Sequence, residues 1–190
     1  MRVCVLGLAL AALWAPLLRA QDAGLPPEWE VRKSLTALVE QTNRLWPLLS
    51  AVKPETWVEK GAPEAYQAQW KSVLSQSDYL VGSAGQLAAD PERLTVALET
   101  LFRMQSLDSL LVSLQEGIAK YQNPALAELI RGAMSDGAAG QEWLRQYVVQ
   151  LASVKEGQFK VMDAEAQRCR TMLLRQPPPQ KSPDKKALPK

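Results

Sequence analysis

Residues 90 to 121 read DPERLTVALETLFRMQSLDSLLVSLQEGIAKY, and this stretch decides the fold class. Asp90, Pro91 and Glu92 form a strong helix start, because Asp can cap free amides, Pro fits the first helical position and Glu complements the helix dipole. The apolar side chains that follow recur at steps of three and four residues: Leu94, Leu98, Leu101, Met104, Leu107, Leu111, Leu114, Ile118 and Tyr121. This spacing predicts a long helix with one buried face.

Two more helices are predicted upstream of this stretch. The first runs from Glu28 to Leu49, with a kink or break at Pro47, which lacks an amide hydrogen. Its apolar stripe is Val31, Leu35, Leu38, Thr42, Leu45 and Leu49. A connection from Lys53 to Ala62 leads to the second, whose stripe is Tyr66, Trp70, Val73, Ser77, Leu80, Ala84 and Leu87. Pro63 suits the first turn of that helix.

Downstream, the pattern predicts a short helical segment and a long last helix. Asn123 and Pro124 repeat the capping signal and open a segment that ends near Ala133. We expect an interruption from Ser135 to Gly140, followed by a last helix from about Gln141 to Arg175. The early stripe of this helix is Leu144, Val148, Leu151 and Val154, and its later stripe is Phe159, Met162, Ala166, Cys169 and Leu173.

No alternating β pattern of useful length appears in the chain, and the connections are short, which favours antiparallel neighbours. We therefore expect an all-α fold: an antiparallel helical bundle of four long helices plus one short helical segment, in a single domain from residue 21 to 175. Residues 176 to 190 contain three consecutive prolines and four lysines. That composition offers no packed core and predicts a disordered tail.

The first 20 residues have the form of a secretory signal peptide. Arg2 precedes an apolar stretch from Val3 to Leu18, which Pro16 interrupts, and the small residue Ala20 suits cleavage. The stretch is short for a membrane-crossing helix, which needs roughly 20 residues. We expect an exported mature chain, periplasmic or extracellular, with no membrane span after cleavage. An uncleaved membrane anchor stays open as the alternative.

Charge and residue content exclude several classes of function. Removing residues 1 to 20 takes away Arg2, Arg19 and no acid, so the mature chain has 20 basic and 20 acidic residues and lacks the dense basic face that nucleic acid requires. The chain has no His, which rules out His-based catalytic triads, HExxH zinc sites and His-ligated haem. We expect a non-catalytic protein without catalytic, cofactor-binding or metal-binding residues.

Tryptophan supplies the candidate binding residues. Trp29, Trp46 and Trp57 bracket the first helix and the loop after it, and exposed Trp side chains can anchor a partner. The alternative is that they fill the ends of the bundle. Of these three tryptophans, Trp57 is the one that periodicity gives the least reason to expect in the core, because Trp57 lies in the connection from Lys53 to Ala62.

Cys169 is the one cysteine left after cleavage, so no disulfide can form within the mature chain. Its position in the late stripe predicts a small buried residue. Two alternatives are a reactive thiolate between Arg168 and Arg170 and an intermolecular disulfide. The late stripe itself has to be covered, either by the helix from Asp90 to Tyr121 or by a second copy of the protein. We expect the intrachain arrangement and a monomer.

Three hypotheses about function remain, and the third is an enzyme that uses Lys, Tyr or carboxylate bases in place of His. The first is an exported helical interaction module, in which an apolar stripe or a Trp side chain binds another envelope or secreted protein. The second is a carrier that holds an apolar small ligand between its helices. A closed core with an exposed apolar patch would favour the module, and an enclosed apolar cavity would favour the carrier.

Overall fold

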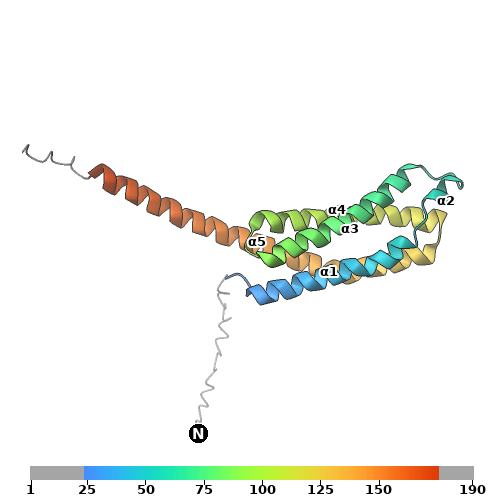
Figure 1. Cartoon of the computed structure of the whole chain (residues 1–190), viewed down its shortest axis with the longest axis horizontal. Helices are drawn as coiled ribbons and strands as arrows, with labels where there is room; N and C mark the ends of the chain where they lie inside the picture. Colours follow the sequence, from blue (N-terminus) through green and yellow to red (C-terminus); the bar gives the residue numbers. More distant parts are fainter. Residues whose placement is uncertain (1–23, 176–190) are drawn as a thin grey trace, which may run out of the picture.

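The computed structural model describes residues 24 to 175, which contain five helices and no strand (Figure 1). They are α1 (Glu28–Ser50), α2 (Glu55–Val58), α3 (Ala65–Ala89), α4 (Leu94–Tyr121) and α5 (Pro124–Arg175). Four of these helices are long, and α1, α3, α4 and α5 pack against one another. The expectation of an all-α fold with four long helices and one short one is confirmed, but the short helix is α2 and the segment predicted from Asn123 to Ala133 is part of α5. The predicted signal peptide and the predicted C-terminal tail lie outside the described residues.

Most of the core consists of apolar stripes that the sequence predicts. In α1 the buried residues are the six of the predicted stripe: Val31, Leu35, Leu38, Thr42, Leu45 and Leu49. In α4 the predicted positions from Leu101 to Ile118 are all buried, whereas Leu94, Leu98 and Tyr121 are half-buried. Periodic leucines therefore identify the inner faces correctly, because a helix must hide its apolar stripe from water.

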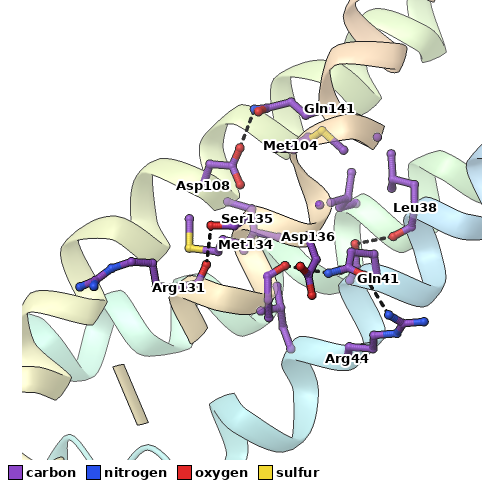
Figure 2. A pocket seen from close by; sticks show the side chains of 18 of the residues that line it. Leu38, Gln41, Arg44, Met104, Asp108, Arg131, Met134, Ser135, Asp136 and Gln141 are labelled. Atoms are coloured by element: carbon purple, nitrogen blue, oxygen red, sulfur yellow. Dashed lines mark hydrogen bonds between the residues drawn. The ribbon is translucent and has the colours of Figure 1, made fainter. Parts of the chain in front are cut away.

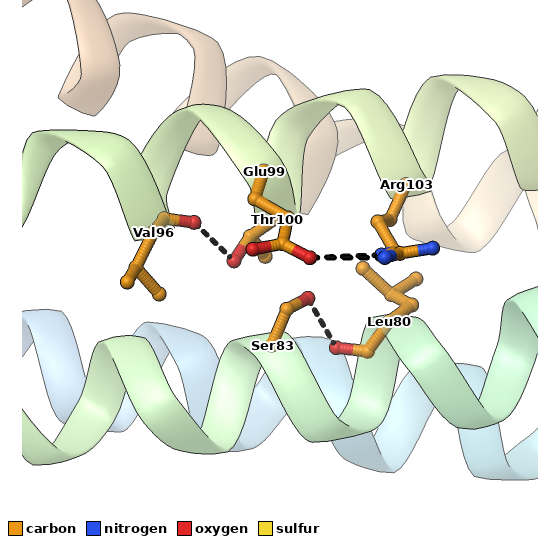
Figure 3. Close-up of polar contacts among 6 residues, drawn as sticks. All are labelled: Leu80, Ser83, Val96, Glu99, Thr100 and Arg103. Carbon is orange, nitrogen blue, oxygen red and sulfur yellow. Dashed lines mark hydrogen bonds and ion pairs between the residues drawn. The ribbon is translucent and has the colours of Figure 1, made fainter.

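Small and hydroxyl side chains line the contact between α3 and α4 (Figure 3). Ser83 Oγ donates a hydrogen bond to the Leu80 carbonyl at 3.1 Å, and Thr100 Oγ1 donates to the Val96 carbonyl at 2.8 Å. Each hydroxyl is thus satisfied inside its own helix, so its burial leaves no unpaired polar atom. Every buried side-chain nitrogen and oxygen in the described part of the chain has a hydrogen-bond partner.

Two expected interruptions are absent from the helices. α1 continues through Pro47 to Ser50, so of the two predicted alternatives, a kink and a break, the break is wrong. Pro47 is exposed, and the carbonyl of Asn43, which loses its helical partner, can bond to water. The short helix of the fold is α2, which forms inside the predicted connection between α1 and α3.

The predicted interruption from Ser135 to Gly140 is also wrong, because α5 is continuous over 52 residues. Ile130 and Leu144 lie on either side of it, and both are fully buried. They are 14 residues apart, just under four turns, so an unbroken helix holds both on one face. We attribute the continuity to this shared burial, which outweighs the roughly 1 kcal/mol that each glycine costs in a helix.

Candidate functional site

The side chain of Trp57 is fully buried, at 0% exposure, where α2 meets the C-terminal end of α4. Its ring stacks on Tyr121 at a centroid distance of 6.3 Å and meets the edge of Tyr66 at 5.5 Å. Its indole Nε1 donates a hydrogen bond to Gln122 Oε1 at 3.0 Å. Of the two alternatives for Trp57, an exposed anchor and a side chain that fills the end of the bundle, the first is wrong and the second is correct. α2 folds this side chain inward, which periodicity could not indicate because the helix has only four residues.

Trp29 and Trp46 are exposed, at 66% and 48%. They are 17 residues apart on α1, which separates them by about 25 Å along the helix axis. The structure does not bring these two side chains together, and Trp57 faces the core. The three tryptophans therefore form no common binding surface, although Trp29 and Trp46 remain accessible individually.

The C-terminal part of α5 leaves the bundle and projects from it (Figure 1). Near the point where α5 leaves the bundle, Lys155 forms an ion pair with Glu92 at 2.7 Å. Every residue from Glu156 to Arg175 is exposed, and we call this segment the α5 extension. At about 1.5 Å per residue its 20 residues span about 30 Å.

The late apolar stripe lies on the α5 extension and is uncovered. Phe159 is 72% exposed, Met162 69% and Leu173 66%. The expectation that α4 covers this stripe is wrong, and so is the expectation that Cys169 is buried, because its thiol is exposed. The sequence could not show this, because coverage depends on where the neighbouring helices end.

The late stripe continues the buried face of α5. Met162, Ala166 and Cys169 follow Leu144, Val148 and Leu151 by 18 residues each, which is five turns of a helix at about 3.6 residues per turn. Leu144 and Leu151 are fully buried and Val148 nearly so. The side of α5 that α1 and α4 cover inside the bundle is therefore the side that remains apolar and open beyond it.

A groove of about 970 Å³ lies between α1, α4 and α5 (Figure 2). The α5 wall is the segment from Ser135 to Gly140, and its small side chains leave the space between α1 and α4 unfilled. A Cβ atom at Gly140 would meet no other atom within 4 Å. The groove was not predicted, although the small residues in this segment were its signal. The floor is apolar: Leu38, Leu45, Leu80, Met104 and Leu107.

Polar groups along the groove are mostly bound to the protein itself (Figure 2). Gln41 Nε2 donates to the Ala133 carbonyl at 2.7 Å, and Gln141 Nε2 donates to Asp108 Oδ2 at 2.5 Å. Burial raises the pKa of the Asp108 carboxyl above its usual value, and the hydrogen bond from Gln141 partly offsets this rise. The groove therefore has an apolar floor and a polar rim.

No group of three or more His, Cys, Asp or Glu side chains that could hold a metal ion occurs between residues 24 and 175. Among the helices of the same range, none is both long enough and apolar enough to span a bilayer. Comparison with known proteins gave no matching protein family, no matching curated protein and no matching solved structure.

Proposed function

We propose that this chain is an exported, non-catalytic interaction module, and that the α5 extension is its binding element. The single observation that carries the proposal is the apolar stripe of Phe159, Met162, Cys169 and Leu173 on the α5 extension, every residue of which is exposed. Burying a Phe, Met or Leu side chain is worth about 1.5–3 kcal/mol, so an uncovered row of them favours association with another surface.

Export is supported by the sequence of the first 20 residues, which has a basic start, an apolar stretch and a small residue before the expected cleavage point. An exported module meets other exported proteins, so the proposed partner class is an envelope or secreted protein. The 20 basic and 20 acidic residues of the mature chain argue against nucleic acid. The absence of His from the whole sequence supports a non-catalytic role.

Site-specific photocrosslinking tests the binding element. A photoreactive amino acid replaces Met162 in the α5 extension and, as the matched control, Phe102, an exposed apolar residue on α4. Crosslinking in intact producing cells is expected from position 162 and not from position 102. Crosslinks of equal yield from both positions, or from neither, would contradict the proposal.

The second candidate function is a carrier for an apolar small ligand, and the groove between α1, α4 and α5 favours it. Its volume of about 970 Å³ suits a drug-sized ligand, and its floor is apolar. The groove is open along one side rather than enclosed, which is why we rank the carrier second.

A fluorescent apolar probe, anilinonaphthalene sulfonate, separates the two functions. Gly140→Phe places a ring in the groove, and Gly82→Phe in α3, outside the groove and the α5 extension, is the matched control, since a Cβ atom at either glycine has open space around it. A carrier loses probe binding in Gly140→Phe alone. Binding that is unchanged in both variants argues against the groove as a ligand site.

A further inference from the structure

We infer that the partner of the α5 extension is a second copy of this chain, and that the two extensions pair in antiparallel orientation. This inference rests on the proposed function of the extension as a binding element. It names the occupant of the apolar stripe and its direction, and five features of α5 carry it.

The first feature is the spacing of the stripe. Phe159, Met162, Ala166, Cys169 and Leu173 follow one another by steps of three, four, three and four residues. This is the seam of a two-stranded coiled coil, in which every apolar side chain inserts between side chains of the facing helix. The seam is narrow, and one partner helix is enough to cover it.

The second feature excludes a parallel pair. Because the stripe continues the buried face of α5, the α1 and α4 helices of each copy lie on the same side of α5 as its stripe. Two parallel copies with facing stripes would bring both bundles into the same space. In an antiparallel pair the two bundles lie at opposite ends of the paired helices and do not meet.

The third feature is the register, which the stripe and the bundle fix together. Two antiparallel registers pair four stripe residues of each copy. One places Phe159 opposite Cys169 of the second copy, but it brings Leu173 of the second copy level with Lys155, where α5 contacts its own bundle.

The other register keeps clear of the bundle and places Met162 opposite Leu173 of the second copy and Ala166 opposite Cys169 of the second copy. The small residues then meet in the middle of the pair, and the larger ones close its two ends. Arg175 of the second copy lies level with Lys160, five residues short of Lys155, so the pair fits beside the bundle.

The fourth feature is charge complementarity. Asp163 and Arg170 lie on the same flank of the stripe, seven residues apart. In an antiparallel pair each flank faces its own equivalent, so Asp163 of each copy lies near Arg170 of the other. This gives two attractive ion pairs, which set orientation and register more than affinity.

The fifth feature concerns Cys169. In this register it faces Ala166 of the second copy, and the two Cys169 side chains are offset along the axis by about 4.5 Å. The pair therefore forms without a disulfide. Because the paired segment, residues 160 to 175, spans only about 24 Å, we expect a reversible dimer with a dissociation constant on the order of micromolar.

Sedimentation velocity of the purified chain from about 1 µM to about 200 µM tests self-pairing. We expect a monomer–dimer equilibrium that Leu173→Glu weakens by at least about tenfold, because a charge then replaces an apolar contact. Phe102→Glu, on the exposed face of α4, is the matched control and leaves the equilibrium unchanged. Cys169→Ala also leaves the dimer in place.

A charge swap tests the orientation. Asp163→Arg alone and Arg170→Asp alone each place like charges together and weaken the dimer by about threefold to tenfold. The double variant restores the attraction and therefore the wild-type affinity. In a parallel pair Glu165 would face position 170 and would repel the Asp of the double variant. A double variant that still dimerises weakly would therefore show that the antiparallel assignment is wrong.

Cysteine crosslinking gives an independent readout in the Cys169→Ser background. Met162→Cys together with Leu173→Cys is expected to give a covalent dimer under oxidation. Either substitution alone is not, because each residue lies about 16 Å from its own equivalent, beyond the roughly 7 Å limit for a disulfide. Covalent dimers from the single variants would overturn the antiparallel register.

The failure of this inference can be told from the failure of the proposed function. A chain that is monomeric at the highest concentration, yet crosslinks to another protein from position 162 in cells, overturns self-pairing and leaves the interaction module in place. A monomer that crosslinks to nothing from position 162 overturns both. In every case Leu173→Glu leaves the binding of the fluorescent probe in the groove unchanged, because Leu173 lies outside the groove.

Discussion

The ring of Trp57 lies directly against Gly117 of α4. A Cβ atom at position 117 would stand 2.9 Å from Cζ3 of Trp57 and 2.7 Å from Cε1 of Tyr66, closer than side chains approach. The burial of Trp57 therefore depends on a glycine near the C-terminal end of α4 but still inside the helix, where glycine is otherwise unfavourable. The two residues are 60 positions apart in the sequence, and neither indicates the other.

Gly117→Ala should lower the free energy of unfolding by about 1–3 kcal/mol, because the new methyl group forces the Trp57 and Tyr66 rings to shift. The control is Gly82→Ala in α3, where a Cβ atom meets nothing within 4 Å. That variant should gain about 0.5–1 kcal/mol from helix propensity. Urea denaturation measures both. A gain in stability for Gly117→Ala would mean that the Trp57 ring does not pack against Gly117 of α4.

Trp57→Ala should destabilise the bundle by about 3–5 kcal/mol, since it removes a fully buried ring and leaves Gln122 without its indole partner. Trp29→Ala and Trp46→Ala should each change stability by no more than about 0.5 kcal/mol, because both side chains are exposed. Thermal unfolding of the three variants measures the contrast. Similar losses in all three would contradict the placement of Trp57 in the core.

Asp108→Asn should raise the unfolding midpoint at neutral pH. The Asp108 pKa is raised by burial, so the folded state favours the protonated carboxyl. The stability contributed by this group is present below its unfolded pKa and is lost as the pH rises through the folded one. The advantage of the Asn variant should therefore disappear as the pH falls below the carboxyl's ordinary titration range. Midpoints measured at acidic and neutral pH give this difference.

A chain that ends after Lys155 should unfold at the same midpoint as the full-length chain, within about 2 °C, at a protein concentration where both are monomeric. The reason is that every described residue beyond Lys155 is exposed and adds no core contact. As the concentration rises, the midpoint of the full-length chain should increase through dimerisation, whereas that of the shortened chain should not. A large loss at low concentration would show that the extension packs on its own bundle.

The exported protein should begin near Gln21, since the apolar stretch before it is short and Pro16 interrupts it. Intact mass spectrometry of protein recovered from outside the cytoplasm measures the start. A mass that includes Met1 would favour the uncleaved anchor instead.

The sequence by itself determined the helical elements and their inner faces. All six buried positions of α1 follow from steps of three and four residues, as do six of the eight buried positions from Leu101 to Ile118 in α4, the exceptions being Gln115 and Gly117. Helical periodicity is a local property, and the chain has to hide whichever apolar stripe it carries. The same local rules failed at the segment from Ser135 to Gly140, where burial of Ile130 and Leu144 keeps α5 intact despite three glycines nearby.

Only the tertiary structure decided which stripe is covered. Leu151 and Cys169 lie on the same line of α5, five turns apart, and the first is fully buried while the second is exposed. Nothing in their spacing distinguishes them, because the difference arises from where α1, α3 and α4 end. The burial of Trp57 and the groove beside Gly140 have the same origin. Each depends on residues that are distant in the chain and meet only when the helices pack.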